Sequence, residues 1–399
     1  MPNKMTHLIL FDSSEIHISL RPITLTRPVS EIRIGIQTIR EKWSFFFPES
    51  KVSYLTESYL SGKYPTLETS DDKLYISSAV CPTSQLVEEI KKMGLDEGLY
   101  YNNHLIAYRS NKPIAHYGEI PTFSSTSQSS CTNLTIISSL PHLFLYNGTE
   151  ITRDFSLITK GRNSQPITDP YTKIYNEQNI FVEEGADIKA AILNAEKGPI
   201  YIGKKAIIQE GSILIGPICV HDDSMIAWGS KIRPNTTLGP VCRVGGEVGN
   251  SIFLGYSNKA HDGFLGNSVI GEWCNLGANT TNSNLKNDYK EVGLYHYGAR
   301  DIVPSSELFC GTFMGDYTKA GIMTMFNTGT VVGVSSNIYG GGFQDKFVPS
   351  FTWGGKTDGY VPYRFDKAIE VIQATMARRS KTLSFDDIDI LTHIHQNNW

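Results

Sequence analysis

The 399-residue sequence predicts an α/β domain followed by a parallel β-helix, and its strongest signal is a six-residue period in the second half. An isolated α-helix repeats every 3.6 residues and a strand every 2, so a period of six fits neither. It fits a solenoid whose triangular coil takes six residues per side, with one aliphatic residue of each six pointing to the axis. Two long series and a short one follow this period: Ile202, Ile208, Leu214, Val220, Ile226, Ile232, Leu238 and Val244; Ile302, Leu308, Met314, Ala320, Phe326, Val332 and Ile338; and Phe264, Ile270 and Leu276. We therefore predict a β-helix over residues 181–342.

The first 165 residues lack this period and mix strand-like with helical runs. LILF at 8–11 and KLYIS at 73–77 predict strands, whereas residues 84–95 carry apolar side chains on one helical face. Such alternation predicts a Rossmann-like α/β domain over residues 1–165 with a mostly parallel sheet.

The remaining segments join or follow these two domains. Polar, turn-forming residues around 160–170 place a linker at 166–180. After the β-helix, residues 343–399 contain a Gly-rich crossover and an amphipathic helix that ends at Arg378 and Arg379. A last short helix is expected after Ser384, with Asp387 completing its N-terminal cap.

Composition narrows the function classes. The net charge of −4 and the absence of a basic stripe disfavour a nucleic-acid partner. The apolar run from Leu8 to Phe11 is too short for a signal peptide or a membrane span, so we expect a cytoplasmic protein with no membrane partner. The 6 cysteines form no CxxC pair, which indicates neither a zinc site nor a disulfide framework.

Polar residues gather where the period breaks, at 245–263 and at about 279–301. Loops that leave a rigid scaffold often carry function. Lys259 and His261 lie in the first break, and the second is rich in Asn, Thr and Lys. A histidine suits a general base, whereas lysines and Arg233 suit phosphates and asparagines suit sugar hydroxyls. Alternatively, His261 fills a turn that the asparagines cap; the spacing leaves both interpretations open.

The segment from Arg233 to Lys290 resembles the acetyltransferase half of the bacterial bifunctional enzymes that make UDP-N-acetylglucosamine. The matching residues are Arg233, Pro234 and Thr236, then Asn258, Lys259, Ala260, His261, Leu265 and Gly266, then Asn275, Leu276, Gly277 and Ala278, and finally Asn284 and Lys290. The resemblance implies His261 as catalytic base. It implies substrate-binding roles for Arg233, Lys259, Asn275, Asn284 and Lys290, and places Ala278 at the coenzyme. The family's substrate-binding tyrosine falls on Phe264, and a phosphate-binding lysine falls near Ser251.

The N-terminal half resembles sugar-1-phosphate nucleotidyltransferases in a divergent form. The stretch from Leu20 to Pro28 matches the segment that follows their Gly-rich loop, but Asp12 to His17 replaces the loop itself. Glycines in that loop expose backbone N–H groups to a triphosphate. Arg21, Arg27 and Lys42 are the candidates for nucleotide phosphates. Alternatively, these side chains are solvated or paired with carboxylates.

Nearly the whole chain is similar to a variant family of UDP-N-acetylglucosamine diphosphorylase and glucosamine-1-phosphate N-acetyltransferases, through residues 26–43, 256–290 and 325–340. The resemblance implies acetyl transfer from acetyl-CoA to an amino-sugar 1-phosphate in a left-handed β-helix. It also implies Mg²⁺-dependent nucleotidyl transfer from UTP in the first domain, with unknown metal ligands, and a homotrimer acting on sugar phosphates and nucleotides.

Two other function classes stay open: a nucleotidyltransferase whose β-helix only oligomerises or regulates, and a non-catalytic sugar-nucleotide binding protein. A carbonic-anhydrase-like metal site is disfavoured, because His221, His261 and His296 share no repeat phase.

Overall fold

The computed structural model describes residues 7–67, 72–112, 117–119, 122–397 and 399. The chain divides into two compact units. The N-terminal unit comprises Met1–Leu20, Thr26–Ile32 and Gln37–Ser139, and the C-terminal unit comprises Arg21–Leu25, Arg33–Ile36 and Leu140–Trp399. The main boundary therefore lies at Ser139, whereas the sequence predicted it at residue 165.

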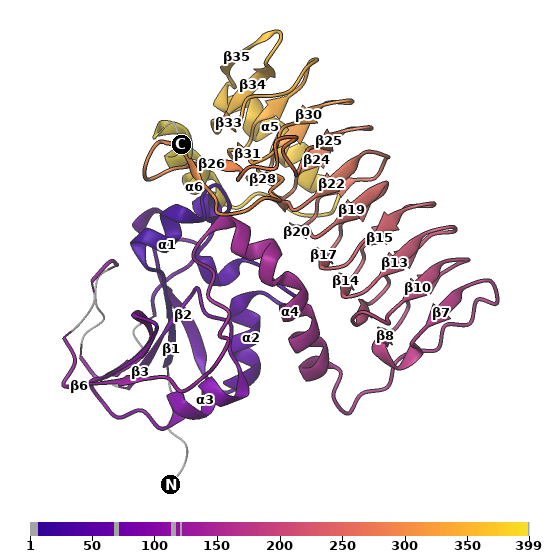
Figure 1. The fold of residues 1–399 in the computed structure, drawn as a ribbon. Coiled ribbons are helices and arrows are strands. Elements are labelled where there is room, and N and C mark those ends of the chain that lie inside the picture. Colours follow the sequence, from indigo (N-terminus) through magenta and orange to yellow (C-terminus); the bar gives the residue numbers. More distant parts are fainter. Residues whose placement is uncertain (1–6, 68–71, 113–116, 120–121, 398) are drawn as a thin grey trace. The chain divides into compact units, whose positions relative to one another are not determined.

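The N-terminal unit is built on a six-stranded mixed sheet of order β2-β1-β3-β5-β4-β6 (Figure 1). Its strands are β1 (His7–Phe11), β2 (Lys51–Leu55), β3 (Lys73–Ser77), β4 (Glu97–Tyr101), β5 (His104–Ser110) and β6 (Ser125–Gln128). Its helices are α1 (Ser14–Ser19), α2 (Ile39–Phe46) and α3 (Ser84–Lys91), with single turns η2 (Val29–Glu31) and η3 (Ser58–Leu60); η1 (Ile23–Thr26) straddles the two units.

The predicted α/β class is confirmed for this unit. β1 pairs in parallel with β2 and β3, and β4 with β6, whereas β5 is antiparallel to both β3 and β4. All five residues of β3 are buried, as its apolar run predicts for a central strand. The helix expected from residue 84 begins there, where the Thr83 side chain accepts a hydrogen bond from the Leu86 backbone N–H.

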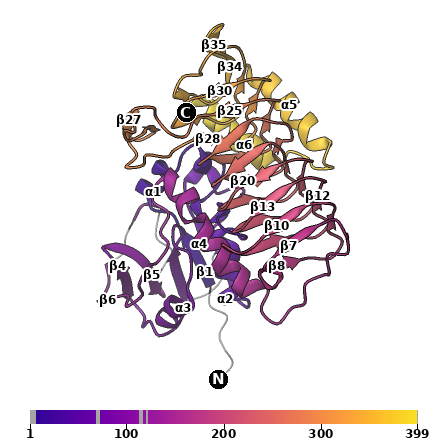
Figure 2. The same ribbon diagram turned by 45° about the vertical axis from the view of Figure 1, so that its right-hand side comes forward.

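The C-terminal unit is a parallel β-helix with three faces (Figures 1 and 2). The six-stranded face contains β7 (Lys173–Tyr175), β10 (Ile192–Asn194), β13 (Ile213–Ile215), β16 (Lys231–Ile232), β19 (Glu247–Gly249) and β22 (Phe264–Gly266). The nine-stranded face contains β8 (Ile180–Val182), β11 (Ile200–Ile202), β14 (Ile218–Val220), β17 (Thr236–Leu238), β20 (Ile252–Gly255), β23 (Val269–Glu272), β28 (Thr312–Met314), β31 (Thr330–Val332) and β33 (Phe347–Val348).

The ten-stranded face contains β9 (Asp187–Ile188), β12 (Ile207–Ile208), β15 (Met225–Ile226), β18 (Arg243–Val244), β21 (Asn258–Lys259), β24 (Asn275–Leu276), β29 (Lys319–Ala320), β32 (Asn337–Ile338), β34 (Thr352–Gly355) and β35 (Gly359–Pro362). Two short pairs complete the strands: the parallel pair β25 (Thr281–Asn282) and β30 (Met325–Phe326), and the hairpin β26 (Gly293–His296) and β27 (Asp301–Pro304).

The β-helix extends beyond the predicted range on both sides. β7 lies within the expected linker 166–180 and pairs with β10, while β33, β34 and β35 follow residue 342. The single turn η4 (Glu177–Asn179) connects β7 to β8. Both predicted C-terminal helices are present, as α5 (Phe365–Ala377) and α6 (Phe385–Gln396), and Ser384 and Asp387 form the expected capping box.

The six-residue period marks the core correctly in the first series. Register pairs Ile208 with Ile226 and Ile226 with Val244, so equivalent residues of successive coils stack into one buried column. Two residues of the second series were predicted wrongly. Ile302 and Leu308 are 45% and 48% exposed, because both lie in the insertion that leaves the coil between β25 and β28. In the short series Leu265, not Phe264, occupies the core.

Only one of the two predicted breaks interrupts the coil. Residues 245–263 continue it through β19, β20 and β21, but with shorter turns that shift the period: register pairs Val244 with Lys259. The second break is a true insertion that carries the hairpin β26–β27.

Helix α4 (Leu140–Ile158) covers the outer side of the nine-stranded face, which explains why it groups with the β-helix. Ile151 packs with the outward side chains of Phe181, Tyr201 and Cys219. Segment 33–36 is also held there: Thr237 Oγ1 donates to the Gly35 carbonyl at 2.8 Å. Gly35 has φ +76°, and a Cβ atom on it would lie 2.7 Å from the Glu150 backbone carbon, so glycine is required.

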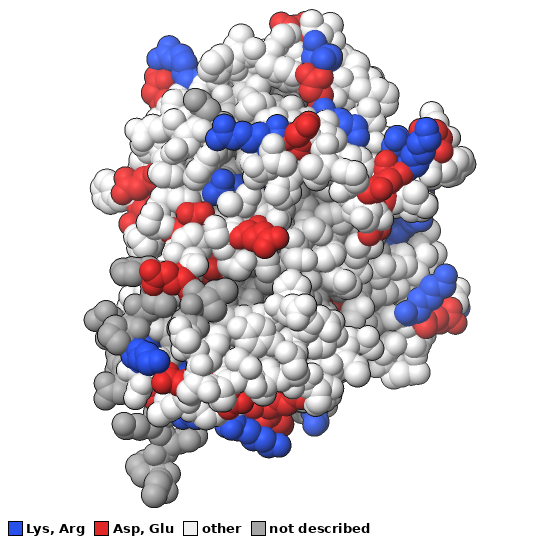
Figure 3. Space-filling view, turned by 60° about the vertical axis from the view of Figure 1, so that its left-hand side comes forward, with Lys and Arg blue, Asp and Glu red and all other residues white. Residues whose placement is uncertain are grey.

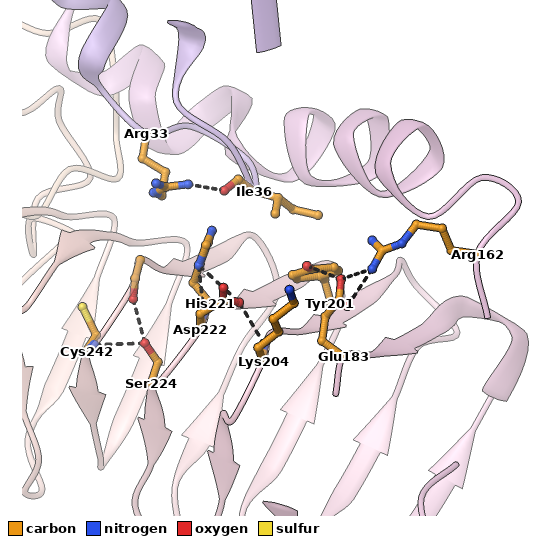
Figure 4. Close-up of polar contacts among 11 residues, drawn as sticks. Arg33, Ile36, Arg162, Glu183, Tyr201, Lys204, His221, Asp222, Ser224 and Cys242 are labelled. Carbon is orange, nitrogen blue, oxygen red and sulfur yellow. Dashed lines mark hydrogen bonds and ion pairs between the residues drawn. The ribbon is translucent and has the colours of Figure 1, made fainter. Parts of the chain in front are cut away.

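The chain that leaves α4 is tied to the first coils by a buried carboxylate (Figure 4). Arg162 Nη2 donates to both oxygens of Glu183, at 2.8 and 2.7 Å, and Tyr201 Oη donates to Glu183 Oε1 at 2.7 Å. Burial alone would raise the pKa of Glu183, but these hydrogen bonds and the arginine charge outweigh it and lower that pKa.

Within the described residues, no helix is both long and apolar enough to cross a membrane. On the face drawn in Figure 3, acidic and basic side chains of the described residues are interspersed rather than gathered into one stripe.

Candidate functional site

A cavity of about 400 Å³ lies in the C-terminal unit, on the outer side of the ten-stranded face. Its lining comes from strands β18, β21 and β24, from turns of the coil and from the end of α5. The residues that carry polar or aromatic groups into it are Arg243, Tyr256, Asn258, His261, Trp273, Asn275, Thr375, Arg378 and Arg379.

The register of three adjacent strands determines which side chains form the floor of this cavity. Arg243 is paired with Asn258, and Asn258 with Asn275, on three adjacent strands. Each is followed by a residue whose side chain is buried inside the coil, so the alternation of a strand turns these three outward. Neighbouring strands are about 4.8 Å apart, which brings the guanidinium and two amides within reach of one small ligand.

His261 lies in the turn after β21 and lines the cavity with an exposed side chain. Lys259, two residues earlier, does not reach it: its side chain points into the coil and is 1% exposed. Lys259 Nζ donates to the His261 carbonyl at 2.9 Å and to the Gly245 carbonyl at 3.2 Å. The expected substrate contact by Lys259 is therefore corrected. This lysine fixes the backbone at His261 from within the core.

The position of Lys259 is costly for a charged group. Burial lowers the pKa of this ammonium to about 8, against an opposing contribution from Asp262. The unfolded chain retains the ordinary value of 10.5 and binds more protons than the folded chain between these two values. Stability should therefore rise as the pH increases from about 8 to 10.5.

Replacing Lys259 by methionine tests this arrangement. We expect the variant to fold and to lose the part of the rise in unfolding free energy between pH 8 and pH 10.5 that Lys259 contributes. It should also lose roughly tenfold in the rate of any reaction that uses His261, because the turn is no longer held. Urea titrations at several pH values measure the first effect. Lys319→Met, at a lysine whose Nζ atom is buried but donates to neither carbonyl, is the control for the effect on the rate. An unchanged rate in Lys259→Met would contradict the role of this lysine.

Three arginines meet at the cavity without a compensating charge. Across the described parts of the chain, the guanidinium groups of Arg243, Arg378 and Arg379 form no ion pair or side-chain hydrogen bond. Burial and the neighbouring charges of Arg243 and Arg378 lower the pKa of Arg379. Such a cluster is stabilised by an anion, and guanidinium groups bind phosphate in bidentate geometry.

An aromatic pair forms another wall of the cavity. Tyr256 and Trp273 stack with ring centroids 4.2 Å apart and planes 11° from parallel. Both have left-handed backbone conformations, with φ values of 54° and 60°, in successive turns of the coil. Asn258 Oδ1 is buried with no partner among the described residues, so it offers an acceptor to a ligand.

Two predicted residues besides His261 lie at this cavity, namely Asn275 and Ala278. Three others do not line it. The Arg233 side chain is 59% exposed and pairs with Glu247 at 3.3 Å, and the Lys290 side chain is 76% exposed in the insertion. Asn284 Nδ2 donates to Asn267 Oδ1 at 2.8 Å.

From the sequence we did not predict that Arg243, Arg378 and Arg379 lie together at one site. Arg243 directly precedes the core residue Val244, which marks it as outward-facing, but no sequence spacing links it to the end of α5. The helix dipole by itself favours cationic side chains at a helix C-terminus, so the two arginines at that end do not by themselves indicate a binding site.

A second pocket, of about 330 Å³, lies in the N-terminal unit where β1 and β3 end. Asp12 lies there, and its carboxylate is already engaged. Oδ2 accepts from Thr56 Oγ1 at 2.6 Å and lies 3.0 Å from His17 Nδ1, while Oδ1 accepts from the Val29 backbone N–H at 3.2 Å.

This pocket does not fit a nucleoside triphosphate with magnesium. Neither lysine nor arginine is found among its described lining residues. Arg21, Arg27 and Lys42 are 8%, 4% and 3% exposed and line neither pocket, and the Arg21 guanidinium stacks 4.0 Å from the Trp399 ring centroid within the C-terminal unit. The described residues also contain no cluster of three His, Cys, Asp or Glu side chains able to hold a metal ion.

Residues 8–163 match the family model described as sugar nucleotidyl transferase. The chain is 32% identical over 154 residues to a bifunctional sugar-1-phosphate nucleotidylyltransferase/acetyltransferase of Sulfurisphaera tokodaii, covering 38% of each chain. It is 37% identical over 109 residues to the bifunctional protein GlmU of Methanococcus aeolicus, covering 27% of this chain and 26% of that one. The matches thus span less than two fifths of these relatives.

Solved structures also align with this chain, at low identity. An Arabidopsis UDP-N-acetylglucosamine acyltransferase is 12% identical, with 57% of this chain and 87% of that chain covered and a TM-score of 0.26. The N-acyltransferase AntD of Bacillus cereus, as a mutant in complex with dTDP and coenzyme A, is 15% identical, with 55% and 100% covered and a TM-score of 0.22.

Proposed function

We propose that this chain is a transferase of sugar-nucleotide synthesis, and that its β-helix acetylates the amine of an amino-sugar 1-phosphate from acetyl-CoA. The observation that carries the proposal is the single cavity shared by His261 and three unpaired arginines. A base and a phosphate site so close together suit a substrate that bears both an amine and a phosphate. The partial similarity to bifunctional nucleotidylyltransferase/acetyltransferases supports the same class of reaction.

In this mechanism His261 acts as general base. Its neutral imidazole accepts a proton from the amine as the amine nitrogen attacks the thioester carbonyl carbon. The new C–N bond forms as the carbonyl oxygen becomes an oxyanion, which backbone N–H groups of the coil would stabilise. Collapse of this intermediate breaks the C–S bond, and the imidazolium returns its proton to the departing thiolate of coenzyme A.

The other cavity residues would hold the two substrates. Arg243, Arg378 and Arg379 would bind phosphate groups, and Asn258 and Asn275 would hydrogen-bond sugar hydroxyls. Ala278 would lie beside the coenzyme. Arg233, Asn284 and Lys290 lie outside the cavity of their own chain. The homotrimer that the resemblance implies stays a prediction, and light scattering of the purified protein tests it.

Nucleotidyl transfer by the N-terminal unit is the second candidate, and the family match over residues 8–163 favours it. The lining of the pocket in this unit opposes it, since neither lysine nor arginine is found among its described lining residues. We therefore assign no reaction step to that pocket and derive none through magnesium.

Product analysis tests the proposed acetyl transfer. Purified protein is incubated with acetyl-CoA and glucosamine 1-phosphate, with and without UTP, and products are identified by mass spectrometry. We expect N-acetylglucosamine 1-phosphate and coenzyme A in both mixtures. If coenzyme A is not released with any amino-sugar 1-phosphate, the proposal is wrong; a UDP-sugar formed without acetyl-CoA would instead favour the nucleotidyltransferase alternative.

A further inference from the structure

The pocket of the N-terminal unit contains a buried hydroxyl that has no partner. Tyr108 lines this pocket and is 3% exposed, and among the described residues nothing forms a hydrogen bond with its Oη atom. A buried hydroxyl without a partner carries a free-energy penalty, so such groups in folded proteins commonly meet a ligand or a water molecule. Burial also raises the pKa of Tyr108, which keeps the hydroxyl protonated and able to donate.

The ring of Tyr108 is fixed, so its hydroxyl has a set position. It stacks on Tyr75 with centroids 4.1 Å apart and planes 9° from parallel, and Phe11 and Phe123 pack against it with centroids 5.6 Å away. This aromatic cluster continues the sheet core formed by Ile9 and Leu55. A side chain held on several sides keeps its polar atom preorganised for binding.

The charged groups around the pocket are predominantly acidic. Asp12, Glu15 and Glu119 line it, together with His104 and the hydroxyl-bearing Ser13 and Ser14, and the described lining includes no lysine or arginine. Phosphates would meet like charge at these carboxylates, whereas an ammonium group would meet opposite charge. Because Asp12 is engaged by Thr56 and His17, the carboxylate of Glu15 is better placed to accept hydrogen bonds from a ligand.

The remaining lining is apolar and suits a ring. Leu55, Leu105 and Ile136 contribute aliphatic surface beside the aromatic side chains. A volume of about 330 Å³ is at the small end of ligand pockets. Apolar walls with a few hydroxyls and carboxylates recognise a compact molecule that has C–H faces, several hydroxyls and no phosphate.

We propose that the pocket at the ends of β1 and β3 binds an amino sugar that bears no phosphate, through its ammonium group and hydroxyls, and not a nucleoside triphosphate. Glu15 binds the ammonium group, and Tyr108 donates its hydroxyl to an oxygen of the sugar. This site is independent of the acetyl transfer proposed for the β-helix, since its residues all belong to the N-terminal unit.

Calorimetric titration of the full chain tests the proposal, with glucosamine, N-acetylglucosamine, and UTP with magnesium as separate probes. We expect glucosamine to bind at least roughly tenfold more tightly than N-acetylglucosamine, in which the positive charge is lost. Tyr108→Phe keeps the ring and removes the orphan hydroxyl, so it should fold as stably as the natural chain and weaken glucosamine binding roughly three- to tenfold. Glu15→Gln should weaken it by a similar factor.

Tyr101→Phe, on the same sheet but outside the lining, is the matched control and should bind glucosamine as the natural chain does. The proposal is overturned if glucosamine does not bind, or if it binds equally well to Tyr108→Phe and Glu15→Gln, which would place it elsewhere in the molecule. It is also overturned if UTP with magnesium binds and loses affinity in Tyr108→Phe. None of these outcomes depends on acetyl-transfer activity.

Discussion

Replacing His261 by alanine is expected to lower the rate of acetyl transfer by about 10²- to 10⁴-fold, the usual contribution of a positioned general base. The physical reason is that no other histidine lines the cavity among the described residues, so the amine would have to lose its proton to water. Binding of acetyl-CoA should change little, because the proton moves only in the transition state. Steady-state kinetics with varied acetyl-CoA and sugar phosphate separates the two effects.

His221→Ala provides the matched control for this variant. His221 lies in another turn of the same β-helix, where its Nδ1 accepts from the Asp222 backbone N–H at 2.9 Å (Figure 4). Its loss should leave acetyl transfer within about twofold of the natural rate if only His261 is the base. Thermal unfolding of both variants checks that each is folded. If His261→Ala retained the full rate, the proposed mechanism would be wrong, whatever the cavity binds.

Removing the arginine cluster is expected to have the next largest effect. A hydrogen bond to a charged group contributes about 1.5–3 kcal/mol, so Arg243→Ala or Arg379→Ala should raise KM for a phosphate-bearing substrate by roughly 10- to 150-fold. The double variant should lose more, although the two effects will not simply add because both arginines face one anion. The turnover number should fall less than the affinity, since these groups bind the phosphate in ground and transition states alike.

Arg364→Ala is the control for charge on α5. This arginine lies at the start of the same helix and pairs with Asp366 at 2.6 Å, away from the cavity lining. Its loss should leave KM unchanged. Equal effects of Arg364→Ala and Arg379→Ala would mean that the general charge of the helix, and not a defined phosphate site, controls binding; raising the salt concentration would then weaken both variants alike.

The core of the β-helix was predictable because one local rule decides it. Each inward position of a coil must carry an apolar side chain, and the residues from Ile202 to Val244 satisfy that rule at a constant spacing. The rule fails where turns change length. After Val244 a shorter coil brings Lys259 inward, and the insertion that follows β25 carries Ile302 to the surface. Hydrophobic spacing alone does not encode the length of a turn.

The domain boundary was less predictable for a similar reason. Residues 140–158 read as part of the first domain, since they precede the repeat and have no six-residue period. In the structure they form α4, whose apolar side packs on the outward residues Phe181 and Tyr201 of the β-helix. A helix shows in its sequence that it has an apolar face, but not which surface that face covers.

By itself the sequence determined the β-helix, its terminal helices and the place of His261 in a turn, because each depends on residues close together in the chain. Only the tertiary structure decided what surrounds His261. Strand register aligned Arg243, Asn258 and Asn275, and the return of α5 brought Arg378 and Arg379 to the same cavity. Such long-range proximity results from packing, which minimises the exposed apolar surface of the whole unit. It therefore leaves no pattern of residue spacing in the local sequence.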